Sequence, residues 1–331
     1  MRTLALRWET LLVGLFLCTL VLAINFAVDF VSAVNFSQAT TQIMEKAIVA
    51  LALTLIIVVG EIDLSVASMM GLASAVLGRL LLLGVPLGPA IAICLLVGAL
   101  GGLVNGLLVT RLGLPSLVVT LGTLALYRGL AFVVLGSEAV SEFPPFVTEF
   151  GFGSVPRTLL PWSFVVFVVL LIPFMVVLHR SWIGRQLYAI GNNEQAASFS
   201  GVRVNRLKVW LFVTSGLLSA LAGLIYTGRL SSARADNALG FELDVITAVL
   251  LGGVSVFGGR GTLFGVVVAL FLIAIIRNAL GLADYSGEIQ SIAVGGLLIF
   301  SVLATNALQT LEERSQRRRQ RAASRASPGT S

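Results

Sequence analysis

The stretch GPAIAICLLVGALGGLVNGLLV at residues 88–109 decides the fold class, because it carries no charged side chain over its whole length. A helix of about 20 apolar residues crosses the roughly 30 Å hydrocarbon core of a membrane. Similar stretches recur along the chain, which is 57% hydrophobic and only 11% charged. Soluble domains are about 25% charged, so lipid is the expected solvent. The sequence predicts an all-α, polytopic membrane protein.

About ten apolar segments are long enough to be membrane spans. They lie at residues 10–29, 42–59, 64–83, 88–109, 115–136, 161–179, 208–228, 243–257, 261–280 and 288–306. Two junctions between them are short. Gly60-Glu61-Ile62-Asp63 separates one pair of segments, and Gly258-Gly259-Arg260 separates another. Each junction is either a tight turn or a break inside a re-entrant segment.

An even number of spans places both termini on the same side of the membrane. Most of the 22 Lys and Arg residues fall on that side, so the positive-inside rule predicts that it faces the cytoplasm. We therefore expect a cytoplasmic N-terminus at residues 1–9, a transmembrane domain at 10–306 and a basic cytoplasmic tail at 307–331. Within the transmembrane domain, residues 137–160 form an external loop and residues 180–207 a cytoplasmic one.

The external loop combines prolines, acids and aromatic residues. Its members are Glu138, Glu142, Phe143, Pro144, Pro145, Phe146, Glu149, Phe150, Phe152 and Pro156. The prolines limit regular structure, whereas the acids and aromatic rings suit a docking surface for an external partner. An ordered cap over the helix ends explains the same composition.

The cytoplasmic loop contains a short predicted helix. Asn193 can cap its first turn, Glu194 suits the positive end of the helix dipole, and Gly201 can end it. A soluble partner can bind a short helix outside the membrane and displace it. A solvated loop helix without a partner has the same pattern.

Four segments carry a resemblance to a known family. Glu194, Ala196, Ala197 and Gly201 are similar, apart from the exact register of the alanines, to the coupling loop of ABC importer permeases. GEIDLSV at 60–66, GRQLYAIGNNE at 184–194 and LGGVSVFGGRGT at 251–262 resemble hallmarks of ribose/xylose/arabinose-type permeases. On overall likeness, the chain looks most like the permeases of rhamnose uptake systems, with autoinducer-2 permeases as near relatives.

This resemblance implies a pore subunit of an ATP-driven monosaccharide importer in the bacterial inner membrane. It implies cytoplasmic ATPase subunits, a second permease that is identical or paralogous, a periplasmic sugar-binding protein and surrounding lipid as partners. It implies neither a cofactor nor a nucleic-acid partner. The residues expected to couple the ATPase to the pore are Asn193, Glu194, Ala196, Ala197 and Gly201.

The side chains available for chemistry point away from an enzyme. Neither Lys46 nor Lys208 follows a glycine-rich phosphate loop, so this chain is not expected to bind ATP in that way. His179 is the single histidine, so a histidine-rich metal site cannot form. Energy for transport is therefore expected from another subunit.

An ion-coupled secondary transporter of a small polar solute is the alternative function. Such carriers place acids within the membrane, and Glu61 and Asp63 are the best candidates if residues 42–83 form a broken helix. The same acids, with Ser65, can instead cap the following helix. Arg128 and Arg277 also fall in predicted spans, where each must face protein or water or extend toward a span end.

A sugar pathway needs neutral polar contacts as well as these acids. The predicted lining consists of Glu61, Asp63, Ser65, Asn105, Thr120, Thr123, Ser255, Asn278 and Gln290. Most of these side chains could equally form hydrogen bonds between packed helices.

Overall fold

The computed structural model describes residues 2–27, 29–299 and 303, so the predicted tail at 307–331 lies outside the described part. The described residues are 76% helical, and they form two isolated β-bridges but no strand. The helices are α1 (Arg2–Phe26), α2 (Ala33–Val58), α3 (Val66–Leu82), α4 (Leu87–Arg111), α5 (Ser116–Leu135), α6 (Pro145–Phe152), α7 (Trp162–Arg180), α8 (Trp182–Asn192), α9 (Glu194–Phe199), α10 (Val204–Leu230), α11 (Phe241–Leu251), α12 (Leu263–Leu282) and an unlabelled helix, Gly287–Ile299. The all-α prediction is confirmed.

Seven helices of the described chain are long and apolar enough to cross a membrane, namely α1, α2, α4, α5, α7, α10 and α12. A helix occurs in each of the predicted segments, but α3 has 17 residues and α11 only 11. At about 1.5 Å per residue, α11 covers roughly half of the hydrocarbon core. The predicted count of ten spans is therefore not confirmed. The predicted span at 243–257 is too long, because α11 ends before Gly253 takes a φ of +87°.

Helix α2 occupies the centre of the molecule. Its most apolar window is 94% buried, and the helix packs against α7, α10, α11 and α12. A helix that is hydrophobic on all sides can be covered on all sides, as this one is. The segment after α2 begins at an exposed Gly60 and leads into the bundle, where Asp63 is buried.

Helices α4 and α10 form the most extensive helix pair. Their contact depends on small residues, because a Cβ at Gly102 of α4 would overlap the backbone of Phe212 in α10. Gly98 of α4 meets Gly216 of α10 in the same way. Glycines at such crossings let two helix backbones approach closely, which is how helices associate in lipid.

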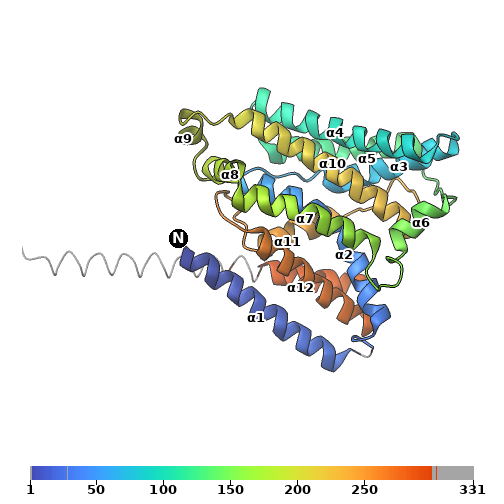
Figure 1. The fold of residues 1–331 in the computed structure, drawn as a ribbon. Coiled ribbons are helices and arrows are strands. Elements are labelled where there is room, and N and C mark those ends of the chain that lie inside the picture. The colour runs from blue at the N-terminus through green and yellow to red at the C-terminus, as the bar shows by residue number, and fades with distance from the viewer. Residues whose placement is uncertain (1, 28, 300–302, 304–331) are drawn as a thin grey trace, which may run out of the picture.

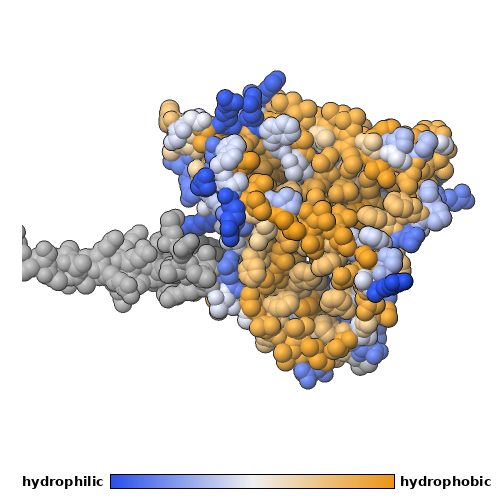
Figure 2. Space-filling model, viewed as in Figure 1, coloured by the Kyte–Doolittle hydropathy of each residue, from blue (hydrophilic) through white to orange (hydrophobic). Residues whose placement is uncertain are grey.

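The bundle has two different ends. Figure 1 shows α8, α9 and the N-terminal end of α1 at one end, and α6 at the opposite end. Figure 2 shows mainly apolar residues between these ends, with hydrophilic residues gathered at both. This distribution is the one that a membrane-spanning protein requires.

The short helix α6 departs from the expectation that prolines would limit regular structure at 137–160. It begins at Pro145, and proline is tolerated in the first turn because the amide it lacks has no helical acceptor there. The rings of Phe146 and Phe150 stack with their centroids 5.9 Å apart, and Phe150 stacks on Trp162 at 6.2 Å. Gly151 then packs α6 closely against the end of α10.

Candidate functional site

The predicted short helix outside the spans is present as α9. Its cap is Asn193, whose Oδ1 accepts a hydrogen bond from the amide of Ala196 at 2.9 Å. After the helix, Gly201 takes a φ of +84°, and the amide of Val202 donates to the carbonyl of Ala197 at 3.1 Å. A glycine in the left-handed region lets the last carbonyls of a helix find partners. The capping residues inferred from the sequence thus have those local roles.

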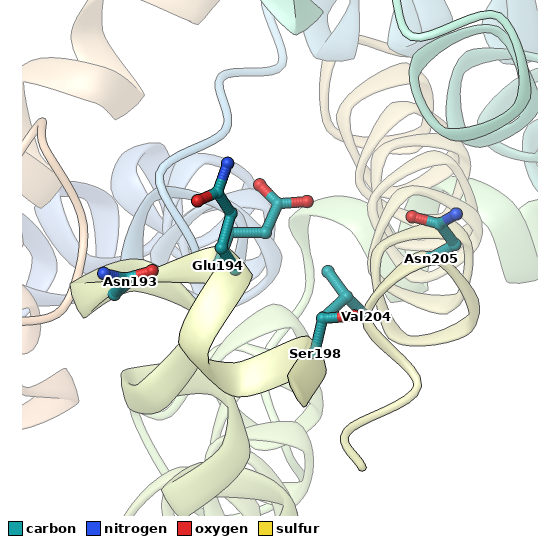
Figure 3. A pocket seen from close by; sticks show the side chains of 6 residues that line it. Asn193, Glu194, Ser198, Val204 and Asn205 are labelled. Atoms are coloured by element: carbon teal, nitrogen blue, oxygen red, sulfur yellow. The ribbon is translucent and has the colours of Figure 1, made fainter. Parts of the chain in front are cut away.

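One face of α9 is exposed to solvent, and the other packs against the rest of the protein. Ala197 is buried beneath the helix, whereas the side chain of Phe199 is 91% exposed. A hollow of about 520 Å³ lies beside the helix, between α9 and the first turn of α10. Its lining consists of Asn193, Glu194, Gln195, Ser198, Val204 and Asn205, as Figure 3 shows. Phe199 was not predicted as a site residue, although a phenylalanine in an otherwise polar loop helix is a signal visible in the sequence.

The helix α8, which the sequence analysis missed, positions α9. Ser181 caps it by accepting a hydrogen bond from the amide of Gly184 at 3.2 Å. Near its other end, a Cβ at Gly191 would overlap the carbonyl of Val58 and the amide of Gly259. This close approach is possible only because Gly191 has no side chain. It places the end of α8 directly against the end of α2.

The three segments at 60–66, 184–194 and 251–262 meet at this point. The amide of Gly259 donates to the carbonyl of Val58 at 2.8 Å. The phenol of Tyr188, on α8, donates to the carbonyl of Gly261 at 2.6 Å. Burial raises the pKa of Tyr188 to about 12, so its phenol stays protonated and remains a donor at neutral pH. The resemblance motifs therefore form one structural unit.

The N-terminal helix supports the same unit from a distant part of the chain. The indole Nε1 of Trp8 donates to the carbonyl of Leu251 at 3.1 Å. The carboxylate of Glu9 accepts a hydrogen bond from the hydroxyl of Thr262. Both residues lie on the first turns of α1, and no local pattern predicted these partners.

Glu61 and Glu194 share one cation at this end of the bundle. The Nζ of Lys208, on α10, lies 2.6 Å from Oε1 of Glu61 and 2.8 Å from Oε2 of Glu194. The sequence predicted no ion-pair partner for Lys208. The structure places it between the polar break and α9.

The polar break between α2 and α3 carries a buried hydrogen-bond network. Asp63 is only 1% exposed and accepts hydrogen bonds from the hydroxyls of Ser65 at 2.6 Å and Ser215 at 2.7 Å. The amide group of Asn105 donates to Ser65 at 2.9 Å, and the phenol of Tyr127 lies 3.4 Å from Oδ1 of Asn105. A buried carboxylate needs such donors. Ser65 does not form the predicted side-chain cap on α3.

Helix α5 adds two further candidate residues to this network. The hydroxyl of Thr120 donates to the carbonyl of Ile62 at 3.3 Å, and Thr123 is buried one turn later. The amide of Ile62 in turn donates to the hydroxyl of Ser116 at 3.1 Å. Six of the nine predicted pathway residues therefore lie in or beside the break: Glu61, Asp63, Ser65, Asn105, Thr120 and Thr123.

The other three predicted pathway residues lie elsewhere. Ser255 accepts a hydrogen bond from the amide of Phe257 within the 252–262 loop. Asn278 forms a reciprocal amide pair with Asn35, at 2.8 and 2.9 Å. Gln290 is partly exposed and donates to the carbonyl of Tyr285. The structure thus does not bring all nine residues into one lining.

A second group of charged residues comes from α2, α5, α10, α11 and α12. Lys46 and Arg277 both pair with Asp244, at 2.5 and 2.6 Å. Glu45, which is fully buried, pairs with Arg229 at 2.6 Å. Arg128 of α5 donates to backbone carbonyls, including those of Ala235 and Asn237. Arg128 and Arg277 therefore face protein partners.

The comparisons with known proteins agree with one another on the family. Residues 35–302 match the family model described as branched-chain amino acid transport system / permease component. The ribose import permease protein of Haemophilus influenzae is 36% identical over 288 residues, which cover 85% of this chain and 88% of that protein. No solved structure matches the chain.

Two further relatives import a different compound. The autoinducer 2 import system permease protein of Yersinia enterocolitica is 38% identical over 264 residues, which cover 77% of this chain and 78% of that protein. The corresponding protein of Escherichia coli strain K12 is 35% identical over 304 residues, covering 89% and 91%. The model match and these relatives together cover most of the chain, and the chain therefore belongs to the permease family of branched-chain amino acid, ribose and autoinducer-2 ABC import systems.

Proposed function

We propose that this chain is the transmembrane subunit of an ATP-driven importer for a monosaccharide or a closely related small polar solute. The observation that carries the proposal is α9. It is a capped helix with an exposed face, packed at one end of a bundle that belongs to a family of import permeases. Such a helix can transmit movement of a soluble subunit to the bundle behind it.

The proposed partners occupy the two ends of the bundle. Cytoplasmic ATPase subunits dock on α9, and a periplasmic sugar-binding protein docks at α6, where Glu142 and Glu149 are exposed. A second permease subunit completes the pore. In this proposal the chain lies in the bacterial inner membrane with both termini in the cytoplasm, as the distribution of basic residues favours.

In this role the chain carries out no covalent chemistry, because ATP hydrolysis belongs to the separate subunit. The coupling residues in this proposal are Asn193, Glu194, Ala196, Ala197 and Gly201. The buried network around Asp63 forms part of the pathway or of the element that opens it.

The identity of the imported solute is the most specific part of the proposal. The relatives named above import ribose and autoinducer-2, which supports a sugar or a small sugar-like compound. Rhamnose remains a prediction from overall likeness. An ion-coupled carrier, the alternative, is not favoured by membership of this family. Uptake assays with ribose and rhamnose, in cells that carry the whole system, discriminate between the two sugars.

The docking of an ATPase on α9 can be tested at Phe199. We expect Phe199→Asp to leave the amount of permease in the membrane unchanged, because this side chain is exposed. The ATPase should no longer co-purify with the variant, and uptake should fall with it. The measurement is the ratio of ATPase to permease after affinity purification.

A matched control lies at the opposite end of the bundle. Phe152 of α6 is also an exposed phenylalanine, and Phe152→Asp should keep the ATPase bound. Normal ATPase binding and uptake by Phe199→Asp would remove α9 as the docking site. Sugar-driven proton influx into vesicles that hold this chain alone would support the secondary-transporter alternative instead.

A further inference from the structure

Lys208 connects two segments that are far apart in the sequence. Its ammonium group is the shared partner of Glu61, in the polar break after α2, and of Glu194, the first residue of α9. The Lys208 side chain is only 7% exposed, although it lies near the polar end of α10. The ammonium group of Lys208 therefore pairs with one carboxylate from the polar break, that of Glu61, and with one from the surface helix α9, that of Glu194.

The two ion pairs of Lys208 differ in their exposure to water. The side chain of Glu61 is 13% exposed, whereas that of Glu194 is 52% exposed. An ion pair near water is weak and can break, but a buried charge that loses its only partner is strongly disfavoured. Lys208 is therefore expected to stay with Glu61 when α9 moves, while its contact with Glu194 opens and closes.

Glu61 is linked through the next two residues to α5 and α10. It precedes Ile62, which is hydrogen-bonded to α5 through Ser116 and Thr120. The next residue, Asp63, is hydrogen-bonded to Ser215 in α10. Gly60, with a φ of +82°, gives the break its turn out of α2. A change in the attraction on Glu61 thus reaches α5 and α10 through hydrogen bonds of 2.7 to 3.3 Å.

We propose that Lys208 is a positioning residue that carries a displacement of α9 into the polar break. The role rests on the proposed function, because it requires an ATPase that moves α9. With both acids in place, the ammonium group is attracted toward α9 as well as toward the break. When α9 shifts away, the ammonium group of Lys208 is attracted only toward Glu61. The polar break then readjusts its contacts with α5 and α10.

The test separates ATP hydrolysis from transport in the assembled importer, reconstituted in vesicles with ribose and rhamnose supplied as probes. Lys208→Met keeps the length of the side chain but removes its charge. We expect the variant to bind the ATPase and to hydrolyse ATP, while sugar uptake falls about tenfold, so that more ATP is used per sugar. Lys208→Arg keeps the charge and should restore most of the uptake. Uptake and hydrolysis that fall together, in proportion to the amount of complex, would make Lys208 merely structural.

A double-mutant cycle between Glu194 and Lys208 tests the link. Glu194→Gln leaves Lys208 its partner Glu61, so this single variant should fold. If Lys208 carries the link, Glu194→Gln should lower uptake per ATP when Lys208 is present and lower it no further in the Lys208→Met background. If the two effects multiply, Glu194 and Lys208 act independently and the proposal is wrong.

The remaining lysine provides a matched control. Lys46 is also buried and paired with a carboxylate, but it lies in the other charge group. Lys46→Met should leave the ATP used per sugar at the wild-type ratio, whatever its effect on protein abundance. An equal rise in that ratio would show a general effect of lost buried charge and overturn the role of Lys208. Failure of the proposed function is visible separately, because the wild-type chain would then bind no ATPase.

Discussion

At the residue scale, Gly191 shows how one missing side chain assembles the candidate site. Its backbone lies against the carbonyl of Val58 and the amide of Gly259, so α8, α2 and the 252–262 loop meet around it. The neighbouring hydrogen bond from Gly259 to Val58 is 2.8 Å long and depends on the same approach. Neither neighbour can give way easily, because both contacts involve backbone atoms.

We therefore predict that Gly191→Ala destabilises the protein by about 1–3 kcal/mol, the usual cost of forcing extra atoms into a packed site. Thermal unfolding of the purified protein in detergent measures the change. Gly122→Ala is the control, because a Cβ at this helical glycine of α5 meets nothing within 4 Å. Equal unfolding temperatures for the Gly191 variant and the wild type would show that α8 can move away at little cost.

At the element scale, ion pairs tie together helices from distant parts of the chain. Glu45 of α2 is fully buried and pairs with Arg229 of α10. The guanidinium also lies over the ring of Tyr226, 5.0 Å from its centroid. Arg229 is thus the partner that makes the buried carboxylate of Glu45 tolerable.

Removing only one member of this pair should be more harmful than removing both. Arg229→Met leaves a buried carboxylate without its cation, a change expected to cost on the order of 3 kcal/mol. The double variant Glu45→Gln with Arg229→Met removes both charges and should recover much of that loss. Unfolding temperatures of the wild type, the two single variants and the double variant provide the measurement. Losses that simply add would show that the two residues are not coupled.

At the scale of the whole molecule, the orientation of the two polar ends can be tested directly. In a background in which Cys18 and Cys94 are replaced by alanine, new cysteines are placed at Ser198 and Ser141. Both positions are exposed, at opposite ends of the chain's described bundle. A membrane-impermeant maleimide should label the cysteine at 141, but not the one at 198, in intact cells. The reverse pattern would invert the proposed topology.

Local features of the sequence predicted several elements well. The break at Gly60 and the cap of α9 at Asn193 follow from residues whose effects act within a single turn. The helices α6 and α8 were missed for opposite reasons. The prolines predicted little regular structure although Pro145 begins α6, whereas the cap of α8 at Ser181 is a local signal that was not used.

The candidate site could be predicted only in part, because its partners are distant in sequence. The three resemblance motifs were recognised separately, but nothing in the sequence showed that they meet around Gly191. In the same way, Glu61 and Glu194 were chosen for different roles, and only packing places Lys208 between them. Contacts of this kind depend on how helices cross, which local patterns do not fix.

The sequence alone determined that this protein is helical and that lipid is its solvent, because unpaired backbone groups are too costly in hydrocarbon. It did not determine which helices face that lipid. The apolar windows of α1 and α2 have similar mean hydropathies of 2.0 and 1.8, yet the first is 11% buried and the second 94%. Lipid tails and a protein core are equally apolar, so hydrophobicity cannot distinguish them. Only the tertiary structure made α2 the centre of the bundle and buried the polar break that follows it.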